Sequence, residues 1–321
     1  MGRRGARFVP TVAVLAGSLI AVSVVPTSVS ATVRPRLRFG AFVPSAPQSG
    51  MGAVRDLEDA LGRTLDIVMF YQAWGDGSSS DVHPTWLSEG AQGGREILLT
   101  WEPWVPGGSV DQPEYQLRRI VAGDLDGYIR SWAQGLRAYG GPVYLRPMHE
   151  MNGNWYPWSG VTNSNSPRLY RLAWRHLHDI FTHLGADNVR WVWSPNAVDV
   201  PATNRFERYY PGNRYVDVLA LDGYNWGACV PRYGGWQSFD QIFGSAYRRI
   251  TALSAKPVWV AETASAPDGG DKSRWVANMF ASIPERFPRI RAVVWFDSQK
   301  ECDWRLTSPE QAVESASRQL S

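Results

Sequence analysis

Residues 143–158 read VYLRPMHEMNGNWYPW, a run that begins like a β-strand and ends in a polar, aromatic loop. The apolar residues at its start predict a strand over 143–148, and the glycine and proline beyond it predict a loop. Glu150 lies at the junction, beside His149 and close to Asn152, Trp155 and Trp158. A carboxylate at a strand end, among aromatic faces and amide groups, suits acid–base chemistry on a polyhydroxylated ring. The alternative is a surface loop whose aromatic side chains only cap a core.

The alternation of strand and helix extends outward from this run in both directions. Strands are predicted at 37–43, 65–71, 96–101, 143–148, 189–193, 216–221, 258–261 and 290–296. Helical patterns lie between them at 51–61, 84–89, 125–139, 167–184, 206–210, 238–253 and 272–286, and a last helix follows Pro309. Eight such units predict the α/β class and a closed, single-domain (β/α)₈ TIM barrel. An open doubly wound sheet is the alternative, but the nucleotide-binding glycine motifs that usually accompany it are absent.

The N-terminal segment 1–31 has the order of a secretory signal peptide. Three arginines precede an uncharged, mostly apolar run over 8–25, and small residues follow at Ser28, Ser30 and Ala31. We expect cleavage after Ala31, which leaves a catalytic domain at 32–321 and a secreted, extracellular protein. The alternative is an uncleaved membrane anchor, but Pro10 and Gly17 favour cleavage. Without the leader, no stable membrane association is expected.

Composition narrows the class of ligand. The chain has 33 basic and 30 acidic residues, and removal of the three leader arginines leaves 30 of each. A neutral chain argues against nucleic acid, which requires a basic patch. The 16 tryptophans, several beside Gly, Pro and Asn in predicted loops, favour a neutral ligand with flat apolar faces, for which carbohydrate is the natural candidate. Cys229 and Cys302 both fall in loops at one end of the predicted barrel, and an oxidising destination would allow them to form a disulfide.

The active site of a (β/α)₈ barrel lies at the C-terminal ends of its strands. Glu150 and Glu262 follow apolar strands most cleanly, and a glycosidase needs two carboxyl groups. Alternation along the fourth strand points Arg146 into the barrel mouth, where a buried guanidinium needs a carboxylate partner. Glu262 or Asp222 could be that partner. An arginine beside Glu262 would keep it ionised, whereas an apolar environment would keep Glu150 protonated.

These residues resemble those of glycoside hydrolase family 26, a member of the clan A retaining glycosidases. The resemblance is carried by RPMHEMNG at 146–153 with Trp155, LDGY at 221–224, WVAET at 259–263 and VWF at 294–296. It implies that Glu150 is the acid/base and Glu262 the nucleophile. By the same resemblance Tyr224 hydrogen-bonds the nucleophile, Trp295 forms the floor under the cleaved sugar, and Trp155 holds a neighbouring sugar. His149 stands where related clan A families usually have Asn.

Further residues are candidates for substrate binding. These are His149, Asn152, Trp101 and Trp226, with Trp74 and Trp104 as additional platforms. The family resemblance implies an endo-acting enzyme on β-1,4-mannan. A mixed-linkage β-1,3-1,4-glucan or a β-1,3-xylan is the alternative, and the run NWYPW at 154–158 raises the weight of the glucan.

Two other classes of protein are alternatives to a glycosidase. A non-catalytic sugar-binding barrel would keep the tryptophans but would not need two carboxylates at strand ends. A zinc hydrolase would need a second histidine at position 153, which is glycine, so no H-E-x-x-H pair forms. We therefore expect no metal and no cofactor, a polysaccharide or oligosaccharide as partner, and a monomer.

Overall fold

A computed structural model of the chain describes residues 1–2, 5–6, 8–10, 36–75 and 82–321. The contacts divide the chain into two units, Met1–Pro35 and Arg36–Ser321, and all described helices and strands belong to the second. The expected leader lies almost wholly outside the described residues. Within the described parts of the chain, no helix combines the length and the apolar character needed to cross a membrane.

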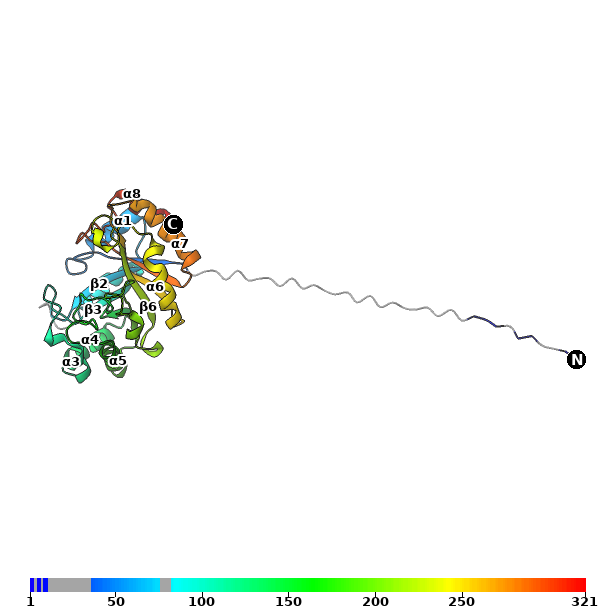
Figure 1. Cartoon of the computed structure of the whole chain (residues 1–321), viewed down its shortest axis with the longest axis horizontal. Helices are drawn as coiled ribbons and strands as arrows, with labels where there is room; N and C mark the ends of the chain where they lie inside the picture. Colours follow the sequence, from blue (N-terminus) through cyan, green and yellow to red (C-terminus); the bar gives the residue numbers. More distant parts are fainter. Residues whose placement is uncertain (3–4, 7, 11–35, 76–81) are drawn as a thin grey trace. The chain divides into compact units, whose positions relative to one another are not determined.

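The second unit is a closed barrel of eight parallel strands in chain order, with helices around the outside (Figure 1). Strand β8 pairs with β1 over five residues and closes the sheet. The predicted (β/α)₈ TIM barrel is therefore confirmed. The strands are β1 (Arg38–Phe42), β2 (Ile67–Ala73), β3 (Glu96–Glu102), β4 (Val143–Pro147), β5 (Val189–Trp193), β6 (Val218–Asn225), β7 (Val258–Ser265) and β8 (Ile290–Phe296).

The helices follow the predicted pattern, with one addition. The α-helices are α1 (Gly52–Leu61), α2 (Pro84–Ala91), α3 (Leu117–Ala122), α4 (Asp126–Tyr139), α5 (Pro167–His183), α6 (Phe239–Leu253), α7 (Lys272–Arg286) and α8 (Glu310–Leu320). Helix α3 is the addition, inside the loop that follows β3. Between β5 and β6 the chain forms only the 3₁₀ turns Phe206–Tyr209 and Asn213–Tyr215.

Strands β6 and β7 run further than their apolar residues predicted. Their pairing continues through Asp222 and Glu262, after a register shift between Leu221 and Asp222, and ends at Asn225 and Ser265. Polar residues inside a strand do not end it, because the backbone ladder is independent of side-chain polarity. This extension keeps the two carboxyl-bearing residues on rigid sheet rather than on loops.

The strand pleat divides large side chains between the inside of the barrel and the helix layer. At the start of the strands, Arg38 lies over the Trp259 ring at 4.6 Å and forms an ion pair with Glu96. Between β1 and β2 the backbones approach so closely that a Cβ on Gly40 would lie 2.5 Å from the carbonyl oxygen of Ile67. These contacts fill the end of the barrel at which the strands begin, opposite the candidate site.

Cys229 and Cys302 form the disulfide that the sequence allowed. The bond joins the loop after β6 to the loop after β8. The same two loops carry Trp226 and Trp304, whose rings lie 5.0 Å apart. The disulfide therefore ties together two loops that border the barrel mouth.

Candidate active site

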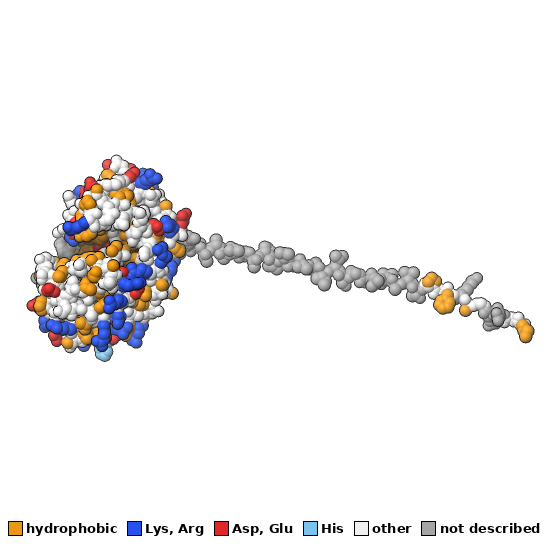
Figure 2. All heavy atoms as spheres, in the orientation of Figure 1, with side chains coloured by type: hydrophobic (Ala, Val, Ile, Leu, Met, Phe, Trp, Pro, Cys, Tyr) orange, Lys and Arg blue, Asp and Glu red, His pale blue; other side chains and the backbone are white. Residues whose placement is uncertain are grey.

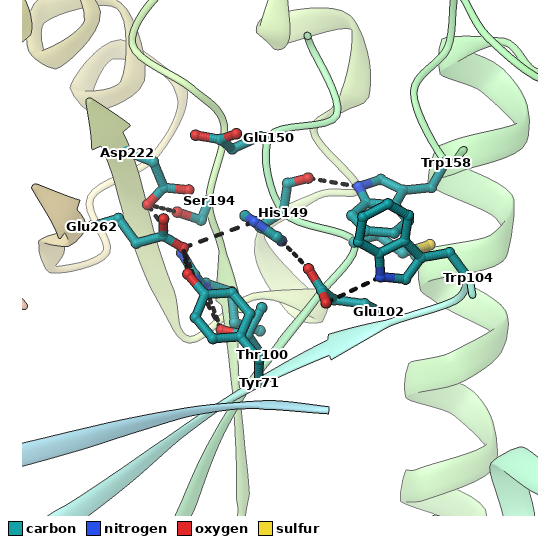
Figure 3. Close-up of polar contacts among 12 residues, drawn as sticks. Tyr71, Thr100, Glu102, Trp104, His149, Glu150, Trp158, Ser194, Asp222 and Glu262 are labelled. Atoms are coloured by element: carbon teal, nitrogen blue, oxygen red, sulfur yellow. Dashed lines mark hydrogen bonds and ion pairs between the residues drawn. The ribbon is translucent and has the colours of Figure 1, made fainter. Parts of the chain in front are cut away.

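Acidic side chains from four strands meet at the C-terminal end of the barrel (Figure 3). Glu102 ends β3, Glu150 follows β4, Asp222 lies in β6 and Glu262 in β7. All four are buried, with exposed fractions of 7% or less. Buried carboxyl groups need hydrogen bonds or counter-charges, so their partners decide which of them is ionised.

Glu262 is held as a carboxylate. Arg146 forms an ion pair with Oε1, the Tyr71 hydroxyl donates to Oε1 at 2.5 Å, and the Tyr224 hydroxyl donates to Oε2 at 2.6 Å. Burial opposes ionisation, but the Arg146 charge and the tyrosine hydrogen bonds outweigh it and lower the pKa of Glu262 to about 2. Glu262 is therefore charged at any pH at which the protein would work.

Glu150 has the opposite character. Burial, and then the negative charge of Glu262, raise its pKa to about 7, although Asn196 and Trp155 stabilise the charged form. The Asn196 amide donates to Oε1 at 2.7 Å and the Trp155 indole donates to Oε2 at 2.8 Å. These two donors fix the orientation of the carboxyl group. Glu150 therefore holds a proton in weakly acidic solution and can release it near neutrality.

The backbone at the end of β4 is strained where it presents Glu150. Met148 and Glu150 have positive φ values of 50° and 51°, which side-chain-bearing residues rarely adopt. Hydrogen bonds from the Met148 amide to the Trp101 carbonyl and from the Glu150 amide to the Ser194 carbonyl hold this conformation. Regular strand alternation ends at Pro147, so the turn rather than the pleat aims Glu150.

Arg146 is fully buried and contacts both of the carboxylates that the sequence suggested. Its guanidinium pairs with Asp222 at 3.1 Å as well as with Glu262, and it donates to the Thr100 hydroxyl at 2.7 and 2.9 Å. Burial raises the pKa of Asp222 well above its usual range, against the attraction of Arg146. Asp222 also accepts from Ser194 at 2.8 Å. The arginine thus connects β3, β4, β6 and β7 beneath the mouth.

His149 lies between two carboxyl groups. Its Nδ1 is 3.8 Å from Glu102 and its Nε2 is 3.8 Å from Glu262, and the ring is 1% exposed. Burial, and then the charge of Arg146, lower the pKa of His149 to about 3, so the ring is neutral. The Trp104 indole donates to Glu102 at 3.1 Å.

Three of the predicted substrate-binding residues do not reach the mouth. Trp101 is fully buried, 5.5 Å from Trp132 and 5.9 Å from Phe181 in the helix layer. Trp295 is also fully buried, and its indole donates to the Trp304 carbonyl. Both predictions are wrong because successive residues of a strand face opposite sides of the sheet. Glu102 and Phe296, one position further along their strands, are the ones with contacts at the mouth.

Asn152 is the third correction. Its side chain is fully buried and binds the loop after β5, where it donates to the Asn196 and Val198 carbonyls and to Asp199. It also accepts from the Asn196 amide at 2.9 Å. Asn152 therefore positions Asn196, which in turn holds Glu150, and it leaves no polar atom for a sugar.

The other predicted aromatics border the mouth. Trp155 and Tyr224 are half-buried and hydrogen-bond the two carboxyl groups, and Trp226 is half-buried 5.9 Å from Tyr224. Trp74 is also half-buried, but it packs on Trp101 at 4.6 Å.

Sequence reasoning missed four residues that contact the site. They are Tyr71 near the end of β2, Glu102 and Phe296 at the ends of β3 and β8, and Asn196 in the loop after β5. Alternation along β2, β3 and β8 could have found the first three, whereas Asn196 had no local signal. Within residues 36–75 and 82–321, no group of three or more His, Cys, Asp or Glu could hold a metal ion.

A family model described as "Glycosyl hydrolase family 26" matches residues 107–261, which include the motif around Glu150 and end one residue before Glu262. The chain belongs to glycosyl hydrolase family 26. The match to this family agrees with the resemblance of the four strand-end motifs.

The curated relatives are named as an endoglucanase, as mannan endo-1,4-beta-mannosidases and as a β-1,3-xylanase. Endoglucanase H of Acetivibrio thermocellus is 38% identical over 283 residues, which is 86% of this chain and 29% of that protein. The mannan endo-1,4-beta-mannosidase of Bacillus subtilis is 31% identical over 170 residues, which is 51% of this chain and 41% of that protein. This chain therefore spans less than half the length of these curated family 26 relatives.

Solved structures agree on the fold. The Bacillus subtilis mannanase BCman superposes with a TM-score of 0.64 at 21% identity, over 90% of this chain and 85% of that one. The family 26 β-mannanase from Bacteroides ovatus gives 0.62 at 20% identity, over 89% and 88%. At this identity the likeness supports the barrel fold alone.

Proposed function

We propose that this protein is a retaining endo-β-glycanase that hydrolyses a β-linked polysaccharide, with Glu262 as the nucleophile and Glu150 as the acid/base. One observation carries the proposal: two buried carboxyl groups at the same barrel end, whose pKa values are driven in opposite directions by their surroundings. Such a split is how an active site assigns one carboxyl to attack and the other to protonation.

The first step is attack of the Glu262 carboxylate on the anomeric carbon while Glu150 donates its proton to the departing glycosidic oxygen. Arg146 keeps the nucleophile ionised, and the two tyrosine hydroxyls orient its oxygens. In the second step Glu150, now ionised, takes a proton from water, which attacks the glycosyl-enzyme. A retaining mechanism predicts carboxyl groups about 5–5.5 Å apart.

The first candidate substrate is β-1,4-mannan. The mannosidase relatives support it. A β-glucan is the second candidate, because the match to the endoglucanase extends over 86% of the chain, against 51% for the mannosidase. A β-1,3-xylan has weaker support, from a relative that is 20% identical.

The proposal includes export and a single-chain active site. The leader pattern at 1–31 and the disulfide support removal of the leader and a secreted domain at 32–321. We also propose that the protein acts as a monomer. On the face shown in Figure 2, basic side chains are scattered among hydrophobic and uncharged ones, which supports a neutral polysaccharide rather than nucleic acid as the partner.

Single substitutions test the catalytic pair. E262Q should lower kcat by roughly 10⁴-fold or more on every substrate. E150Q should retain the glycosylation step on an aryl glycoside with an activated leaving group and show a burst, because that leaving group needs no proton. E314Q, at an exposed glutamate of α8, is the control and should match the wild type. Binding without hydrolysis by the wild type would instead favour a non-catalytic sugar-binding barrel.

A polysaccharide panel tests the sugar. Galactomannan, glucomannan, barley β-glucan, lichenan and β-1,3-xylan would be compared by release of reducing sugar and by product size. Proton NMR of the anomer released first would show whether configuration is retained. An inverted product would contradict the proposed mechanism even if a polysaccharide is cleaved.

A further inference from the structure

Glu102 is one of the four buried carboxyl groups at the mouth, and the catalytic steps above do not use it. It is 5% exposed, and its Oε1 is 3.8 Å from His149 Nδ1 (Figure 3). Neither ring nitrogen of His149 has a hydrogen-bond partner in the described structure, although both are buried. Unpaired buried polar atoms are rare, and hydrogen bonds of an unliganded site often shorten when substrate binds.

The surroundings decide which nitrogen of the neutral imidazole carries its proton. Nε2 is 3.8 Å from Oε1 of Glu262, a carboxylate that Arg146 keeps ionised. A lone pair on Nε2 would face that negative charge, whereas an N–H would be attracted to it. The proton therefore belongs on Nε2, and Nδ1 must be the acceptor.

An acceptor at Nδ1 requires a donor on Glu102. The Trp104 indole N–H donates to Oε2 of Glu102, so that oxygen already acts as an acceptor. A proton on the other oxygen, Oε1, would point at His149. Arg146 forms its ion pairs with Glu262 and Asp222, so it does not supply a direct counter-charge to Glu102.

We propose that Glu102 is a positioning residue whose neutral carboxyl donates from Oε1 to His149 Nδ1 and so keeps the Nε2 proton aimed at Glu262 and the sugar bound there. This inference rests on the proposed function for its kinetic consequence, but not for the tautomer itself. Deprotonation of Glu102 would place a second carboxylate 3.8 Å from Nδ1, the distance at which Glu262 lies from Nε2, and so would remove the preference for the Nε2–H tautomer.

Several charged groups set the pH at which this change occurs. Burial, together with the smaller effect of the Glu262 charge, raises the pKa of Glu102 to about 7, although the Trp104 hydrogen bond, Arg146 and Lys300 oppose the rise. Tyr156 also faces Glu102, but burial raises the pKa of that hydroxyl well above the range in which the site works. The preference for the Nε2–H tautomer should thus be lost as the pH rises through about 7.

The tautomer can be observed without substrate. Long-range ¹H–¹⁵N spectra of the full chain, with His149 assigned from an H149Q spectrum, should show an Nε2–H ring at pH 5.5 that gains a population of the Nδ1–H tautomer above pH 7. In E102Q the Gln amide can donate to Nδ1 at every pH, so the Nε2–H form should persist to pH 9. An Nδ1–H ring at pH 5.5 in the wild type, or the same change of tautomer in E102Q, would overturn the inference.

Kinetics provide the second readout. The alkaline limb of log kcat/KM should be steeper than −1 in the wild type, because both Glu150 and Glu102 lose a proton, and should have a slope of −1 in E102Q. E102L, which removes the donor, should lose roughly 10- to 100-fold in kcat/KM at pH 5.5, and E102Q much less. Thermal unfolding would establish that both variants fold. Equal losses in the two variants would refute the role of a neutral donor, whereas inactivity of the wild type on every glycan would refute the proposed function and leave the tautomer result standing.

Discussion

Replacement of Glu262 by glutamine should lower the pKa of Glu150. The Glu262 charge is the second cause of the raised pKa, after burial. If the carboxyl groups are about 5–5.5 Å apart, as retention requires, their repulsion at an effective dielectric constant of about 20 is about 3 kcal/mol. That energy corresponds to a pKa change of about 2.

E262Q removes the repulsion but keeps the burial, so the pKa of Glu150 should fall from about 7 to about 5. The pKa can be followed by the ¹³C shift of the Glu150 carboxyl group in a pH titration, with the signal assigned from its absence in E150Q. The exposed-site variant E314Q is the control and should leave the pKa at about 7. A pKa that remains near 7 in E262Q would show that the two groups do not share one site, and the catalytic pair would be wrong.

Four further predictions concern the groups around this pair. R146M should lose about 3–5 kcal/mol of stability, because it leaves buried carboxylates without their counter-charge, and chemical denaturation would measure the loss. W155F removes a donor that favours the charged form of Glu150, so the alkaline limb of kcat/KM should move to higher pH; an unmoved limb would contradict this. E150Q should unfold at a higher temperature than the wild type at pH 8 but not at pH 4. Between pH 4.5 and about 7 the folded wild type holds a proton that the unfolded chain has released, which costs it up to about 3 kcal/mol as the pH rises through this window. The double variant C229S/C302S removes the disulfide between residues 73 positions apart and should lose up to about 4 kcal/mol of stability. Thermal unfolding should show a lower melting temperature than that of the wild type, and a reductant should not change the melting temperature of the variant.

The order of the strands could be predicted from local patterns alone. Eight apolar runs separated by amphipathic stretches are enough to imply a parallel barrel, because each pattern depends on residues a few positions apart. The same rule brings the strand ends to one edge, which is why Glu150 and Glu262 could be paired in advance. The extension of β6 and β7 through their polar residues could not be predicted in this way, because backbone pairing with a neighbour decides where a strand ends.

The aromatic residues show where local patterns were insufficient. Trp101 and Trp295 stand in the motifs at strand ends, yet both face the helix layer, and Phe296 rather than Trp295 contacts Tyr224 at the mouth. A position one residue earlier or later reverses the direction of a strand side chain. The composition predicted abundant aromatic surface for a sugar, but only the pleat of each strand decided which rings are available.

The sequence alone predicted the barrel, the end of the barrel that carries the site, and the two glutamates. These three features depend on periodicity and on chain order. Only the tertiary structure decided the chemical state of those glutamates. Tyr71, 191 positions away from Glu262, donates to it, and Asn196 reaches Glu150 from the next strand. A pKa depends on burial and on charges close in space, and the fold brings those groups together from parts of the chain that no local pattern connects.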